Sequence, residues 1–206
     1  MAAEDAPQIY LVSPPEFELS SFPGMLARVL DAREVACVRL ALATRDEDRL
    51  IRAADALREV THARDIALVI TDHIGLVEKL GLDGVHLSDA SKSVREARKA
   101  LGPDAIVGSF CGTSRHDGMA AGEAGCDYVS FGPLTASALD DGATADLDLF
   151  QWWSEMIEIP VVAERGLDAA RIAQLSPFTD FFGLGDEIWQ SDDPVQRLGE
   201  LIEAIG

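Results

Sequence analysis

The chain alternates short apolar runs with longer segments in which apolar residues recur at helical spacing. Eight apolar, mostly β-branched runs predict strands at residues 8–12, 35–40, 66–70, 84–87, 105–108, 127–131, 160–163 and 180–184. The clearest helical pattern covers residues 46–62, where Leu50, Ala53, Ala54 and Leu57 fall on one face. Strand and helix are therefore expected to alternate along the chain.

This alternation predicts a parallel sheet covered by helices. Near-continuous apolar runs are typical of strands buried on both faces, and each return through a helix makes a right-handed βαβ unit. Eight units in 206 residues suit a compact (β/α)8 barrel. An open doubly wound sheet is the alternative, but no G-x-G-x-x-G motif follows the first strand. We therefore predict an α/β fold, a TIM barrel of parallel strands forming one domain over residues 1–206.

Composition limits the kinds of partner. Acidic residues outnumber basic ones 36 to 17, giving a net charge of −19, so the surface repels nucleic acid and anionic membranes. A small-molecule ligand is expected, and self-association into a homo-oligomer stays open. The first residues are acidic where a signal peptide would be basic, and no apolar run reaches the length of a membrane span. We expect a soluble, cytoplasmic protein.

The cysteines add no structural site. Cys37, Cys111 and Cys126 are odd in number, widely spaced and form no C-x-x-C motif. A disulfide framework and a zinc site are therefore not predicted, and a reducing compartment fits.

Active sites of such barrels lie at the carboxyl ends of the strands and in the loops that follow, which restricts the candidates. The residues at these positions are Ser13, Arg39, Thr71, Asp72, His73, His86, Ser88, Asp89, Ser91, Cys111, 132–135, 164–166 and 183–187.

Asp72 and Asp89 follow neighbouring predicted strands and are candidate ligands for Mg²⁺, which takes one or two carboxylates completed by substrate oxygens and water. The alternative is structural. Asp72 would cap a helix that begins near His73, and Asp89 or Ser91 would cap the helix over residues 94–101.

Three other side chains have competing interpretations. His86 lies within an apolar strand, where a hydrogen-bonded core histidine is the common outcome, whereas His73 is expected to be more exposed. Cys111 with a nearby histidine could form a nucleophile and base pair, although no local motif supports one.

The loops after the seventh and eighth strands, A-E-R-G-L-D and G-L-G-D-E-I-W, are where barrels of this kind bind phosphate. Gly166, Gly183 and Gly185 allow close backbone approach, and Arg165 supplies a cation. The carboxylates that would repel a phosphate, unless they point away, are those of Glu164, Asp186 and Glu187.

Several segments together resemble the thiamine-phosphate synthase and thiazole tautomerase family, from Gln8 to about Trp189. They are Y-L-V-S-P, A-L-V-I-T-D-H-I-G-L-V-E-K-L-G-L-D-G-V-H-L, I-V-G-S-F-C, A-G-C-D-Y-V-S-F-G-P-L and I-P-V-V-A-E-R-G-L. The resemblance implies a (β/α)8 barrel. In the synthase branch it implies a transferase that joins hydroxymethylpyrimidine diphosphate to thiazole phosphate with Mg²⁺, forming thiamine phosphate and pyrophosphate.

Carried over by resemblance, Asp72 keeps the position of one Mg²⁺-binding aspartate, whereas the second falls at Ser91 and Asp89, two residues earlier, is the candidate substitute. The substrate-binding positions would be Arg39, Thr71, His73, Cys111, Thr135, Arg165, Gly166 and Gly185.

The chain departs from the family pattern at several of these positions. The strand-two motif glutamine-x-arginine-x-lysine is here R-L-A-L-A from Arg39, and the serine-threonine-histidine element is F-C-G from Phe110. The lysine expected after the sixth strand is missing near Asp140 and Asp141, and a serine after the eighth strand is Asp186. Cations and small donors are replaced by carboxylates and apolar groups.

Three hypotheses follow. The chain is a synthase with unusual ligands, or a diverged member that binds a thiamine-related or other small heterocycle for a different reaction or as a sensor. The third hypothesis is a structural or interaction role, with the barrel mouth plugged by Phe110, Phe131 or the 133–145 loop.

Overall fold

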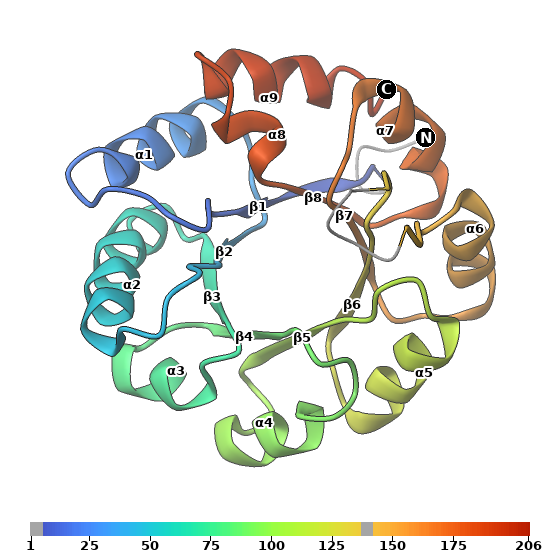
Figure 1. Ribbon diagram of the computed structural model, residues 1–206, viewed down its shortest axis with the longest axis horizontal. Coiled ribbons are helices and arrows are strands. Elements are labelled where there is room, and N and C mark those ends of the chain that lie inside the picture. The colour runs from blue at the N-terminus through green and yellow to red at the C-terminus, as the bar shows by residue number, and fades with distance from the viewer. Residues whose placement is uncertain (1–5, 137–141) are drawn as a thin grey trace.

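The computed structural model describes residues 6–136 and 142–206. Within this part of the chain, eight parallel strands close into a barrel in chain order, because β8 pairs with β1 (Figure 1). The strands are β1 Gln8–Val12, β2 Cys37–Leu40, β3 Ala67–Thr71, β4 Gly84–Leu87, β5 Ile106–Phe110, β6 Tyr128–Phe131, β7 Val161–Glu164 and β8 Phe181–Leu184. The barrel prediction is confirmed, and the open-sheet alternative is wrong.

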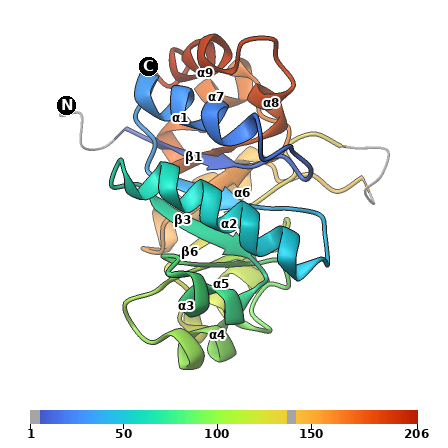
Figure 2. The same cartoon turned by 90° about the vertical axis from the view of Figure 1, so that its left-hand side faces the viewer.

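Helices form a ring around the strands (Figure 1), and the side view shows them lining the flank of the barrel (Figure 2). Their bounds are α1 Phe22–Ala32, α2 Glu47–His62, α3 Ile74–Leu80, α4 Val94–Leu101, α5 Arg115–Ala124, α6 Leu147–Met156, α7 Ala169–Leu175, the short 3₁₀ turn η1 Ser176–Phe178, α8 Asp186–Trp189 and α9 Pro194–Ile202. None of the helices within the described residues is long and apolar enough to cross a membrane.

Helix α2 shows how the sequence pattern sets the packing. The predicted face of Leu50, Ala53, Ala54 and Leu57 is buried, as helical spacing requires. The helix begins after Asp46, whose carboxylate accepts a hydrogen bond from the backbone N–H of the third helical residue at 3.2 Å. Both the apolar stripe and the cap were present in the sequence.

An apolar layer separates the strands from the helices, and we call it the apolar shell. It contains the large, fully buried side chains Trp153, Phe131, Phe150, Phe182, Leu11, Leu26, Leu40, Leu57, Leu68, Ile70, Leu87 and Ile172. Phe131 packs edge-to-face on Trp153 with ring centroids 5.0 Å apart. Because Phe131 belongs to this shell, it does not plug the barrel mouth.

The inside of the barrel holds both polar and apolar side chains. We call the buried side chains of Tyr10, Arg39, His86, Tyr128, Ser130 and Glu164 the polar interior. Gly108 makes room for it, because a Cβ atom at this position would lie 2.0 Å from the ring of Tyr128. The barrel is therefore filled partly by a hydrogen-bonded network and partly by an apolar cluster that includes Cys37, Val69 and Val162.

Candidate functional site

A cavity of about 370 Å³ opens at the carboxyl ends of β1, β2, β7 and β8. This is the end of the barrel where the sequence placed the site. Its lining combines the polar side chains of Ser13, Arg39, Glu164, Arg165, Asp186 and Glu187 with the glycines Gly166, Gly183 and Gly185.

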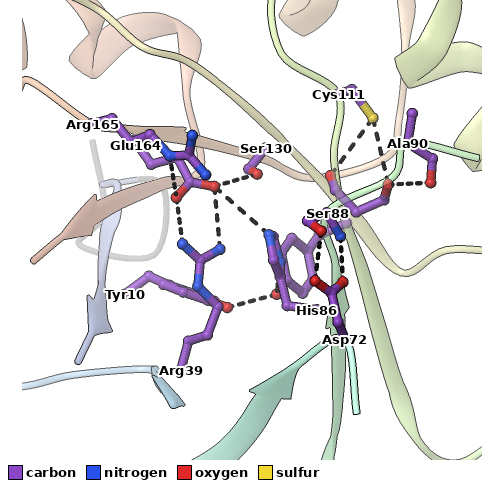
Figure 3. A network of polar contacts seen from close by, with 12 residues as sticks. Tyr10, Arg39, Asp72, His86, Ser88, Ala90, Cys111, Ser130, Glu164 and Arg165 are labelled. Carbon is purple, nitrogen blue, oxygen red and sulfur yellow. Dashed lines mark hydrogen bonds and ion pairs between the residues drawn. The ribbon is translucent and has the colours of Figure 1, made fainter. Parts of the chain in front are cut away.

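A buried ion pair forms the floor of this cavity (Figure 3). The Arg39 guanidinium donates from Nη1 to Glu164 Oε1 at 3.2 Å and from Nη2 to Oε2 at 2.5 Å. Arg39 is 5% exposed and Glu164 is 1% exposed. Ser130 Oγ donates a further hydrogen bond to Oε1. Glu164 therefore has both oxygens bound by groups of the barrel itself.

The electrostatics keep both members of this pair charged. Burial alone would raise the pKa of Glu164, but the Arg39 guanidinium and His86, with the hydrogen bonds from Arg39 and Ser130, outweigh it and lower the pKa to about 2. Burial likewise opposes the charge on Arg39, and Glu164 overcomes it, so that the Arg39 pKa is raised.

The rest of the polar interior is neutral. His86 Nδ1 lies 2.8 Å from the hydroxyl of Tyr128, which lies 2.7 Å from that of Tyr10. His86 Nε2 is 3.8 Å from Glu164 Oε1. Burial, reinforced by the Arg39 charge, lowers the His86 pKa well below 6.5, so that its imidazole is uncharged at pH 7. His86 is a hydrogen-bonded core histidine.

The loops after β7 and β8 meet at one carboxylate. Glu187 Oε1 accepts hydrogen bonds from the backbone N–H groups of Gly166 at 2.8 Å and Leu167 at 3.3 Å, and Oε2 accepts from Gly185 at 2.8 Å. Thr135 supports this turn by donating its hydroxyl hydrogen to the Gly166 carbonyl at 2.9 Å. Of the carboxylates expected to repel phosphate here, that of Glu187 points into the amide groups.

The helix-capping interpretation of Asp72 is wrong. His73 is the N-cap residue of α3, and Asp72 instead accepts hydrogen bonds from Ser88, at 2.8 Å from its backbone N–H and 2.6 Å from its hydroxyl. Its backbone is in the left-handed region, with φ of 61°. Asp72 therefore ties the loop after β3 to the loop after β4.

The capping interpretation of Asp89 and Ser91 is also wrong. The N-cap residue of α4 is Ser93, and Asp89 Oδ2 accepts a hydrogen bond from the Ser93 hydroxyl at 2.6 Å. Asp89 Oδ1 is buried without a hydrogen-bond partner among the described residues.

The residues present do not fit a preformed Mg²⁺ site. Both carboxylate oxygens of Asp72 accept hydrogen bonds from Ser88, and Asp89 accepts one from Ser93 through Oδ2, so that Oδ1 of Asp89 is the one oxygen of this pair of carboxylates with no partner among the described residues. No group of three or more His, Cys, Asp or Glu side chains that could hold a metal ion occurs within residues 6–136 and 142–206. The magnesium assignment remains a prediction that the donor set does not favour.

Cys111 is placed as an inert core thiol. It is 2% exposed, and Sγ lies 3.6 Å from the Ser109 carbonyl and 3.7 Å from its hydroxyl. Burial raises the Cys111 pKa to about 11. In the part of the chain that is described, its hydrogen-bond partners include no histidine, so the nucleophile and base pair is not formed. Cys37 and Cys126 are also free and buried.

The remaining predicted site residues divide into two groups. Arg39, Arg165, Gly166 and Gly185 line the cavity, and Thr135 contacts its edge through Gly166. The cavity lining does not include Thr71, Asp72, His73, Asp89 or Cys111. Asp140 and Asp141 lie outside the described residues.

Arg165 differs from Arg39 in its environment. Its side chain is 54% exposed, with Nε 3.9 Å from Glu164 Oε2 and the guanidinium carbon 4.1 Å from the centre of the Phe110 ring. Its φ of 70° is in the left-handed region. The guanidinium of Arg165 is thus half-exposed at the edge of the cavity, whereas the charge of Arg39 is neutralised by the Glu164 carboxylate.

Sequence reasoning missed the partnership of Arg39 with Glu164, which are 125 positions apart. Two charges at the ends of otherwise apolar strands were a usable signal, because a charge in that setting needs a partner. It also missed Tyr10 and Tyr128, whose inward direction depends on strand register.

Curated relatives match this chain along its length. A thiamine-phosphate synthase of Erythrobacter litoralis is 38% identical, with 99% of this chain and 100% of the relative covered. A thiamine-phosphate synthase of Rhodospirillum centenum is 39% identical, with 88% and 89% covered.

A solved structure of a thiamine phosphate pyrophosphorylase from Pyrococcus furiosus superposes with a TM-score of 0.82 at 18% identity, covering 96% of this chain and 95% of the other. At this identity the likeness shows the fold alone. The family model described as thiamine monophosphate synthase matches residues 9–178. By its sequence match and its barrel, the chain belongs to the thiamine monophosphate synthase family.

Proposed function

We propose that the barrel mouth binds a small, thiamine-related heterocycle and that this chain does not carry out the synthase reaction. The observation that carries the proposal is the buried ion pair between Arg39 and Glu164. In this pair Glu164 binds the guanidinium of Arg39, which is the strand-two cation that the family resemblance assigns to the diphosphate of the substrate.

The ion pair opposes diphosphate binding in two ways. A diphosphate that took over the Arg39 guanidinium would leave the Glu164 carboxylate buried and unpaired, and breaking a buried pair costs about 3–5 kcal/mol. The same carboxylate would also repel the incoming anion at short range. Arg165 offers only an exposed guanidinium beside that carboxylate.

A neutral heterocycle meets neither obstacle. A cavity of about 370 Å³ is within the range of small-molecule sites, and its wall combines apolar Val12 with the hydroxyl of Ser13. Binding in the cytoplasm, with or without self-association, remains part of the prediction.

The test uses the purified full chain with hydroxymethylpyrimidine diphosphate, thiazole phosphate and Mg²⁺ in a pyrophosphate-release assay. We expect no turnover at micromolar protein. Calorimetry with the thiazole alcohol and the pyrimidine alcohol is expected to show saturable binding of at least one. Steady pyrophosphate release would contradict the proposal, and so would a failure of both alcohols to bind.

The second candidate is the synthase reaction itself. The observation in its favour is the 38% identity to a curated thiamine-phosphate synthase over 99% of this chain. Asp72 and Asp89 would then be the residues that hold Mg²⁺, and Arg165 would contact a phosphate. The same assay decides between the two candidates.

A further inference from the structure

Three backbone N–H groups from two separate loops converge on the Glu187 carboxylate. Gly166 and Leu167 come from the loop after β7, and Gly185 comes from the loop after β8. Both carboxylate oxygens are used, and the side chain is partly buried at the cavity wall. The Glu187 carboxylate thus links the two loops through hydrogen bonds.

Such an arrangement of amides is how proteins hold small anions. Successive N–H groups in a glycine-containing turn form a concave anion site, and in barrels the loops after the seventh and eighth strands commonly bind phosphate. Gly166 has a φ of 82° and its Cβ would lie 2.7 Å from Thr135 Oγ1, so that the turn needs glycine. The backbone is built for close approach by an anion.

In this chain the anion is part of the protein. We propose that Glu187 is a specificity-determining residue: its carboxylate fills the anion position between the two loops, so that the mouth selects ligands whose hydroxyl group is not phosphorylated. The proposal rests on the proposed function for the class of ligand, and it adds which form of that ligand is accepted.

The geometry explains why a phosphate would not displace Glu187. The carboxylate is tethered two residues from Gly185, so it cannot leave the neighbourhood of the amides that it would vacate. A phosphate next to it would face like charge, with Glu164 buried in the same cavity wall. An uncharged hydroxyl group carries no such repulsion.

The experiment titrates inorganic phosphate into the full chain and follows the amide signals of Gly166, Leu167 and Gly185 by NMR. The wild-type protein is expected to show no saturable shift of these signals. Glu187→Ala frees the three backbone N–H groups. This variant is expected to bind phosphate at least about tenfold more tightly than the wild-type protein, which corresponds to the gain of one good anion contact.

Asp192→Asn is the matched control, because it removes one negative charge close in sequence to Glu187 from an exposed position outside the cavity lining. We expect its phosphate affinity to stay within about twofold of wild type. Glu187→Gln is the second variant. It keeps the side-chain size but turns an amide NH₂ group toward one of the backbone donors, so that a phosphate gain smaller than that of Glu187→Ala is expected.

Two results would overturn the proposal. One is saturable phosphate binding by the wild type at these three amides. The other is a Glu187→Ala variant, or Glu187→Gln if the alanine variant does not fold, that binds phosphate no more tightly than Asp192→Asn. Neither result depends on whether the wild type binds a heterocycle or releases pyrophosphate, so failure here is distinct from failure of the proposed function.

Discussion

The apolar shell and the polar interior lie on opposite faces of the same eight strands and are built by different rules. In the shell, large side chains such as Trp153 and Phe150 are buried against helices with no charge among them. In the interior, Arg39 and Glu164 are equally buried and are stabilised by each other. Burial alone stabilises the first region, whereas the second depends on pairing.

This difference separates fold from function. Any set of aliphatic side chains of suitable volume would fill the shell, so it defines the barrel without defining a ligand. The interior and the loops above it hold specific charges in specific places, and those charges determine what the mouth can bind. The two regions should therefore respond differently to substitution and to pH.

The largest expected effect comes from breaking the interior pair. Glu164→Gln leaves the Arg39 guanidinium buried without its counter-charge, and we expect the free energy of unfolding to fall by about 3–5 kcal/mol. Urea denaturation measures it. The double variant Arg39→Met/Glu164→Leu removes both charges and should recover most of the loss. A loss below about 1 kcal/mol in Glu164→Gln would show that the pair is not electrostatically coupled.

Leu57→Ala tests the shell. Leu57 is fully buried on the inner face of α2, and its truncation is expected to cost about 2–4 kcal/mol through lost burial and a residual cavity. This loss should be the same at pH 7.5 and pH 5.5, because no titrating group is involved. A loss that changes by more than about 1 kcal/mol between these pH values would contradict the separation of the two regions.

The interior should make stability depend on pH. The His86 pKa is lower in the folded chain than its ordinary value of 6.5, so the unfolded chain takes up the extra proton and stability falls as pH drops below about 6.5. The slope from this group approaches about 1.4 kcal/mol per pH unit.

Glu164 adds a second acid-sensitive range. Its pKa is lowered from 4.5 to about 2, so its contribution is present above pH 4.5 and is lost as pH falls toward 2. His86→Asn is expected to flatten the stability profile between pH 6.5 and 5, whereas His116→Asn on the exposed surface should leave it unchanged. An unaltered slope in His86→Asn would refute the assignment of the neutral imidazole.

The smallest expected effect concerns backbone strain at the mouth. Ala90 has a φ of 57° in the loop after β4, a conformation that costs a residue with a Cβ atom about 1 kcal/mol. Ala90→Gly should therefore raise the free energy of unfolding by up to about 1 kcal/mol, measured by urea denaturation. Ala121→Gly, in helix α5 of the shell, is the matched control and should lower it by at least about 1 kcal/mol. Equal signs would contradict the assignment of strain to the mouth.

The apolar pattern was sufficient to predict the barrel, because near-continuous apolar runs indicate strands buried on both faces and helical spacing indicates the buried face of each helix. Strand ends moved by only a few residues, as at β2, which begins at Cys37 rather than residue 35. The site was harder to predict. Loops at the strand ends were the right places, and Gly166 and Gly185 were found there. The sequence marks Arg39 and Glu164 as charges in apolar strands that need partners, but it does not show that they pair with each other, because that depends on the arrangement of strands distant in sequence.

Glu187 illustrates the same limit. In the sequence it reads as a charge that opposes an anion site, and the structure turns it into the anion that the site holds. Counting charged residues gives the net charge of a loop. Only the direction of each side chain shows whether its charge faces solvent or fills the site.

The barrel mouth is expected to accept a heterocycle and to reject its phosphorylated form. The direct measurement is calorimetry of the wild-type chain at pH 7.5 with the thiazole alcohol and, under the same conditions, with its phosphate ester. We predict that the alcohol binds at least about tenfold more tightly than its phosphate ester, because the uncharged hydroxyl group is not repelled by the carboxylates of Glu164 and Glu187. Tighter binding of the phosphate ester would contradict it.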